Sequence, residues 1–224
     1  MLARQSGRWH PGAAPVPHSE VFASPDDAAG AAFALALAAD GAPGEDHRPW
    51  LWVQDKAAIR RSGRPCRAGL PQGLRHRLIH VAADRPEDAL FALEEGVRCR
   101  DLAFVLGEIA GNPAALDFTA SRRLSLAAER HGVPLWLVRP GAVRDLGSAR
   151  MRWQVGSAPG ARARWNADAP GDPRWHAELF RAHVFQPGQW IVGHEQDGGQ
   201  LAIIAPDHGG VAAGSGDRPL AAGA

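Results

Sequence analysis

The sequence predicts an α/β fold in which a mostly parallel sheet is flanked by helices and continues into antiparallel strands. Two observations support this prediction. Up to residue 140, apolar runs of strand length alternate with segments of helical periodicity, the order typical of parallel βαβ units. Beyond that residue, strand-like runs follow one another without helices between them, which is typical of antiparallel strands.

The elements expected before residue 100 follow from apolar spacing and from helix-end signals. The helix over residues 86–98 has Leu90, Leu93 and Val97 on one face, with Asp84 as its expected N-cap and Glu87 three residues later. We expect strands over residues 21–23, 51–54 and 77–83 and helices over residues 27–39 and 86–98.

The segment from residue 102 to residue 138 contains the most apolar part of the expected sheet. Residues 102–109, LAFVLGEI, have the length and composition of a strand that is buried on both faces. A helix over residues 120–131 then ends at Gly132, a typical C-cap residue, and a buried strand follows over residues 133–138.

The C-terminal part predicts four strands, over residues 151–156, 176–184, 189–195 and 200–204. All four look antiparallel, and the first of them could also continue the main sheet as an edge. Asp197-Gly198-Gly199 is a suitable hairpin turn between the last two.

The chain of 224 residues suits one domain. We expect a flexible Pro/Gly-rich arm over residues 1–17, a single α/β domain over residues 18–204 with its antiparallel part from about residue 150, and a low-complexity tail over residues 205–224. The two cysteines, Cys66 and Cys99, form no CxxC pair, which favours a reducing compartment. With no apolar leader or membrane-length run in the sequence, the expected location is the cytoplasm.

The segment EVFASPDDAAGAAFALALAAD (residues 20–40) has the outline of a phosphate-binding loop between a strand and a helix. A Walker A loop needs a Gly-Lys pair, but Lys56, which follows Asp55, is the one lysine of the chain. We expect Ser24 as the N-cap and Pro25 in the first helical position, with two carboxylates in the first turn that repel polyphosphate. The sequence therefore predicts the shape of a nucleotide site without its chemistry.

Glu108 stands where a Walker B acid would follow a strand. Without a phosphate-binding lysine there is no Mg-nucleotide for it to hold, which favours a hydrogen-bonded polar residue at a strand end.

The chain resembles the ImuA family, RecA-like proteins encoded beside an inactive Y-family polymerase homologue in bacterial damage-induced mutagenesis cassettes. The resemblance runs from about residue 18 to residue 195, and LDFTASRRLSLAAE (residues 116–129) is its most specific stretch. The other matching motifs are AAGAAFALALA, PEDALFALEEGVRCRDLAFVLGEI, the continuation RHGVPLWLVRP, ARMRWQV and PGQWIV.

This resemblance implies a RecA-like core without ATPase activity and without a cofactor. It also implies an accessory role in SOS-induced translesion synthesis. The expected protein partners are the inactive, ImuB-like polymerase homologue and RecA, with an error-prone replicative-type DNA polymerase engaged indirectly.

Basic residues are concentrated between residues 56 and 83, where seven occur without an acidic residue, although the net charge of the whole chain is only +1. Such a segment could bind DNA phosphates weakly, bind an acidic partner, or be a solvated loop. A second basic pair occurs on the exposed face of the 120–131 helix. The candidate contacts for DNA or an acidic partner are Arg60, Arg61, Arg64, Arg67, Arg122 and Arg123.

Arginine and tryptophan alternate between residues 139 and 181, a composition typical of interface anchors. It is also compatible with the edge of a core that arginine stems cover. The candidate partner-binding residues are Arg152, Arg164, Trp165 and Trp175.

Catalytic and metal-binding patterns are absent from the sequence. The ten histidines form no HExxH motif, and the chain has no GxSxG elbow. We therefore expect neither an enzyme nor a metal protein. The alternative is an α/β enzyme or small-molecule-binding domain with an unconventional site near Glu108 and Asp117.

Overall fold

The computed structural model describes residues 7–41, 46–160, 171–194 and 201–206. Fifteen elements follow one another in the order β1 (His18–Ala23), α1 (Ala29–Asp40), β2 (Trp50–Asp55), α2 (Lys56–Ser62), the 3₁₀ turn η1 (Arg67–Gly69), α3 (Gln72–Arg75), β3 (Leu78–Ala83), α4 (Pro86–Arg98), β4 (Val105–Glu108), α5 (Phe118–His131), β5 (Leu135–Pro140), β6 (Met151–Ala158), β7 (Arg174–Ala182), β8 (Gly188–His194) and β9 (Leu201–Pro206) within these ranges.

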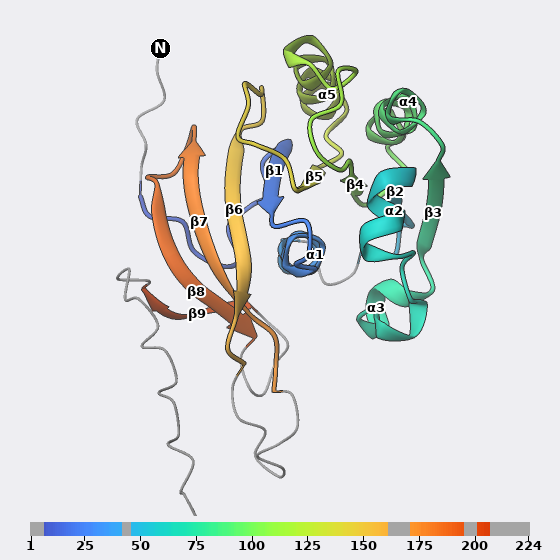
Figure 1. Ribbon diagram of the computed structural model, residues 1–224. Helices are drawn as coiled ribbons and strands as arrows, with labels where there is room; N and C mark the ends of the chain where they lie inside the picture. Colours follow the sequence, from blue (N-terminus) through green and yellow to red (C-terminus); the bar gives the residue numbers. More distant parts are fainter. Residues whose placement is uncertain (1–6, 42–45, 161–170, 195–200, 207–224) are drawn as a thin grey trace, which may run out of the picture.

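The strands form one sheet in the order β3-β2-β4-β5-β1-β6-β7-β8-β9 (Figure 1). Pairing is parallel from β3 to β6 and antiparallel from β6 to β9. The expected fold class, a mostly parallel sheet flanked by helices with antiparallel C-terminal strands, is confirmed. Strand β6 continues the parallel sheet, as the sequence allowed, but as an internal strand between β1 and β7 rather than as an edge.

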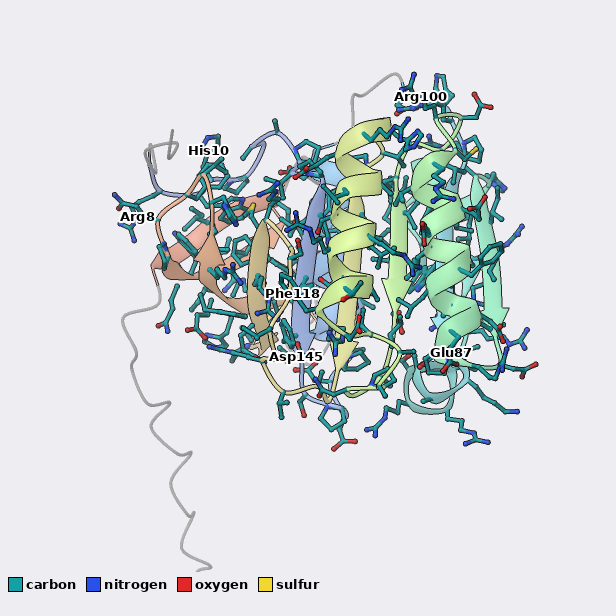
Figure 2. All side chains as sticks on the ribbon, turned by 90° about the horizontal axis from the view of Figure 1, so that it is seen from above. Arg8, His10, Glu87, Arg100, Phe118 and Asp145 are labelled. Atoms are coloured by element: carbon teal, nitrogen blue, oxygen red, sulfur yellow. The ribbon has the colours of Figure 1, made fainter. Side chains whose placement is uncertain are left out.

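Helices cover both faces of the parallel strands. In Figure 1, α1 and α3 lie on the side of the sheet opposite α4 and α5, and Figure 2 shows α4 beside α5 over their common face. Every residue of β1, β2, β4 and β5 is accordingly buried. The core on the α1 side contains seven tryptophans, whereas the core under α4 and α5 is mainly Leu, Val and Ala. None of the described helices is long and apolar enough to cross a membrane.

Helix ends follow local capping chemistry, with one correction. Asp117, which the sequence analysis did not predict as a cap, caps α5, its Oδ1 accepting the Ala120 N–H at 2.7 Å. Gly132 ends this helix with φ 71°, as the sequence predicted. The expected N-cap of α4 was wrong: Arg85 holds that position and Pro86 begins the helix. Asp84 instead lies 3.6 Å from Lys56 Nζ.

The described part of the expected N-terminal arm packs against the fold. Trp9 is buried, with its ring centroid 4.9 Å from that of Trp153 and 5.6 Å from that of Trp190. Residues 7–17 are therefore held by an aromatic cluster, because Trp9 removes a large apolar surface from water. The expected turn at residues 197–199 and the tail beyond residue 206 lie outside the described residues.

Candidate functional site

A cavity of about 570 Å³ opens at the carboxyl ends of β1, β4 and β5, where α/β sheets commonly bind ligands. Its floor is apolar and comes from the strand ends and the start of α1. Charged groups surround it from both sides: Asp26 and Asp27 from the β1–α1 loop, Glu108 from the end of β4, and Arg60 and Arg61 from α2.

The β1–α1 loop differs from its expected geometry. The helix begins at Ala29 rather than beside Pro25, so neither Ser24 nor Pro25 holds its expected position and no carboxylate lies in the first turn. Asp27 accounts for this difference. Its Oδ1 accepts the Ala29 N–H at 2.8 Å, and its carboxylate also binds Ser157 at the end of β6, through the backbone N–H at 2.8 Å and Oγ at 2.7 Å.

Asp27 thus presents its own negative charge at the end of α1 where an anion would bind. Partial burial favours its neutral form, but the hydrogen bonds from Ser157 and Ala29 outweigh burial and lower the pKa of this carboxyl. Asp27 consequently stays ionised at neutral pH and repels phosphate.

Gly30, the glycine of this loop and helix, has a packing role. A Cβ there would lie 2.9 Å from Ala23 Cβ and 3.0 Å from Val138 Cγ1. The absence of a side chain therefore lets α1 approach β1 and β5 closely.

Glu108 is buried and bound by the chain itself. Its carboxylate accepts hydrogen bonds from Trp52 Nε1 at 3.1 Å, Gln54 Nε2 at 3.0 Å and Ser62 Oγ at 3.1 Å. Burial raises the pKa of Glu108, and these three donors oppose that shift. Glu108 is therefore the hydrogen-bonded strand-end residue that the sequence favoured, and Asp117, its companion in the alternative site, caps α5. Among the described residues, no group of three or more His, Cys, Asp or Glu side chains could hold a metal ion.

The basic segment from residue 56 to residue 77 is more structured than a loop. It contains α2, η1 and α3, and three of its arginines donate to backbone carbonyls: Arg67 to Leu78, Arg75 to Ala68 and Leu70, and Arg77 to Asp46, Arg48 and Gly73. These three guanidinium groups stabilise the segment. Within the described part of the chain, Arg60, Arg61 and Arg64 are exposed without a hydrogen bond or ion pair, so only they stay available to an anion.

The two candidate arginines of α5 also differ in whether they have an ion-pair partner. Arg123 Nη2 lies 2.6 Å from Glu94 Oε2 of α4, whereas Arg122 is exposed and has no such partner in the described ranges.

Two of the four candidate partner-binding residues belong to the interior. Arg152 and Trp175 are only 4% and 3% exposed, and Trp175 packs against Phe33 in the α1-side core. Neither is a surface anchor, since all seven tryptophans in the described ranges are buried in that core. Arg164 and Trp165 lie outside the described residues.

A buried charge network, which the sequence reading missed, lies on the opposite face of β1. Glu20 is 2.6 Å from Arg152 Nε and 3.8 Å from Arg139 Nη1, and all three side chains are buried. Arg139 and Arg152 also bind Asp145, in the loop between β5 and β6, and both stack over Phe22. The available signal was a charged residue next to or inside each of three predicted strands.

His18, at the start of β1, is fully buried near this network. Its Nδ1 lies 2.8 Å from Ser125 Oγ of α5. Burial, and then the positive charges of Arg152 and Arg139, lower the pKa of His18 to about 3. The ring is therefore neutral at physiological pH.

These features define the class of the chain: an α/β protein with a cavity at the strand ends whose acidic groups are bound by the chain itself. No known family model matches the chain. It is 33% identical over 158 residues to Protein ImuA of Caulobacter vibrioides, in strain NA1000 / CB15N and in strain ATCC 19089 / CB 15. The match spans 63% of this chain and 62% of the Caulobacter protein. This similarity supports the resemblance to the ImuA family that the sequence motifs predicted.

Proposed function

We propose that the chain is a non-catalytic, RecA-like adaptor in SOS-induced mutagenic translesion synthesis, acting in the cytoplasm. It binds the inactive Y-family polymerase homologue and RecA, and reaches the error-prone replicative-type polymerase indirectly. The similarity to Protein ImuA supports the mutagenesis context. The observation that carries the non-catalytic part is Asp27, whose carboxylate takes the N-terminal N–H of α1 in a chain without a Gly-Lys pair.

The nucleotide part of the proposal is tested by titrating the chain with ATP and ADP, with and without Mg²⁺, in a calorimeter and in a thermal-shift assay. We expect neither heat of binding nor stabilisation. A true ligand at 100 times its Kd would add about 2.7 kcal/mol to the unfolding free energy, which such an assay detects. A micromolar ATP site lost in Arg60→Ala/Arg61→Ala would contradict the proposal.

The adaptor part is tested by mixing the purified chain with the purified polymerase homologue and, separately, with RecA. We expect a complex by size-exclusion chromatography in at least the first case. DNA binding is expected to be weak and strongly salt-dependent, because only a few unpaired guanidinium groups are available to phosphates.

A small-molecule-binding protein is the second candidate function. The cavity itself favours it, since about 570 Å³ suffices for a small ligand and Arg60 and Arg61 face it. The same thermal-shift assay, run against a panel of small carboxylates and phosphates, separates the two functions. The adaptor is expected to show no response.

A further inference from the structure

Large apolar side chains are exposed where α5 begins and in the adjoining loop of residues 141–149. Phe118 and Leu126 on α5 are 47% and 50% exposed, and Val143 and Leu146 in the loop are 71% and 80% exposed. Single exposed apolar residues are common, but a group of them on one face marks a place where another molecule binds.

The loop is fixed in this outward conformation. Asn112 binds it through the Val143 N–H at 2.8 Å and through Asp145 Oδ2 at 2.7 Å. Behind it, the buried Arg152 donates to the Asp145 carbonyl at 2.7 Å, and the Ser148 N–H reaches Ser121 Oγ of α5 at 2.9 Å. The exposure of Val143 and Leu146 is therefore imposed by the buried charge network.

The loop and α5 form one continuous surface. The Ser148 N–H of the loop donates to Ser121 Oγ, which is less than one turn of α5 from Phe118 and next to Arg122. In Figure 2, Phe118 and Asp145 lie on the same half of the molecule, away from Arg100. Phe118, Arg122 and Leu126 are spaced four residues apart, so they share one stripe of α5. Arg122 is thus an uncompensated positive charge between exposed apolar side chains.

We propose that Phe118, Arg122, Leu126, Val143 and Leu146 form a docking face, the α5–loop face, for an amphipathic segment of a protein partner whose apolar side chains surround a carboxylate. The inference deepens the proposed adaptor function and rests on it. The carboxylate pairs with Arg122, and the partner's apolar side chains cover Leu146 and Phe118.

The charge and composition of the α5–loop face favour a protein segment over nucleic acid and over a second copy of this chain. Nucleic acid is bound by several cations along its phosphates, whereas this face has one unpaired guanidinium among four apolar side chains. A symmetric contact between two copies would bring the two Arg122 side chains together without a carboxylate between them. A protein segment with a carboxylate inside an apolar stripe supplies both a counter-ion for Arg122 and an apolar surface for the side chains around it.

The test uses the full chain and the purified, ImuB-like polymerase homologue as the probe. Arg122→Glu and Leu146→Asp are compared with Arg100→Glu, an exposed arginine at the opposite end of the molecule in Figure 2. We expect both face variants to melt like the wild type, because these side chains are exposed, and to raise the Kd about tenfold or more. Arg100→Glu keeps the wild-type Kd. Replacing the partner's interacting carboxylate by lysine restores binding to Arg122→Glu.

Each other outcome overturns the inference in a distinguishable way. If the wild type binds the homologue and the face variants bind equally well, the inference fails and the adaptor function stands. If the wild type binds neither the homologue nor RecA, the adaptor function fails and the inference with it. If the wild type instead dimerises in sedimentation equilibrium and the face variants are monomeric, the proposed occupant is wrong.

Discussion

On both sides of β1, carboxylates are bound by other groups of the chain, but the surfaces that result differ. Toward α1, Asp27 and Glu108 are bound by donors of the chain, so the cavity at the strand ends keeps its shape but presents no anion-binding chemistry of the usual kind. Toward α5, Glu20 and Asp145 are bound by Arg139 and Arg152, and the result is a fixed loop with exposed apolar side chains. Carboxylates bound by groups of the chain therefore leave the first surface without a free anion-binding group, and beside the second they fix a loop whose apolar side chains are exposed.

The strongest test of this comparison is to remove the buried carboxylate. In Glu20→Gln, Arg139 and Arg152 keep their charges in the interior while losing their main counter-ion. We expect the unfolding free energy to fall by about 3–5 kcal/mol in urea denaturation. Glu129→Gln, which removes the partner of the half-exposed Arg150, is the control and is expected to cost below about 1 kcal/mol. Equal effects would mean that the buried network does not hold the loop.

Gly30→Ala tests whether the glycine beside the cavity serves packing. Its new Cβ would lie 2.9 Å from Ala23 Cβ, so α1 must shift away from the sheet. We expect a loss of about 1–3 kcal/mol in the same assay. Gly73→Ala in α3 meets nothing within 4 Å and is expected to be neutral or slightly stabilising. A neutral Gly30→Ala would contradict the packing role.

A pH dependence of stability carried by His18 is also expected. Its folded pKa, about 3, lies below the ordinary 6.5, so the unfolded state binds the proton more tightly. Stability is therefore complete above about pH 6.5 and falls as the pH drops toward 3, by up to about 1.4 kcal/mol per unit. Between pH 7 and pH 5, where few carboxylates titrate, His18→Asn is expected to remove the His18 part of this slope, while His80 and His183, whose pKa values burial also lowers, keep theirs. An unchanged slope would assign it to other groups.

Local patterns predicted most of the fold. The bounds of α4 were predicted to the residue, and Gly132 marked the end of α5, because these signals depend on neighbours in sequence. The charge network could not be predicted in this way. Glu20 and Arg152 are far apart in the chain, and only the parallel pairing of β1 with β6 places them opposite each other.

The site predictions failed where composition was the only guide. Arginine with tryptophan is typical of interfaces, but Trp175 is buried in the α1-side core and Arg152 is buried beside Glu20 on the opposite face of β1. In the basic segment, charge alone could not show that Arg67, Arg75 and Arg77 would bind carbonyls. Arg122 was predicted as a contact, but the exposed apolar residues around it follow from a loop held by distant bonds.

The packing of Trp9 against Trp190 has a consequence for synthesis of the protein. The two rings belong to opposite ends of the described chain, and Gly7 accepts a backbone hydrogen bond from Gln186 at 3.0 Å nearby. While the chain is growing, Trp9 emerges long before Trp153 and Trp190, so its indole lacks these packing partners until both strands have followed it. Closing this aromatic cluster is thus a long-range step in folding, because it joins residues that are far apart in the sequence.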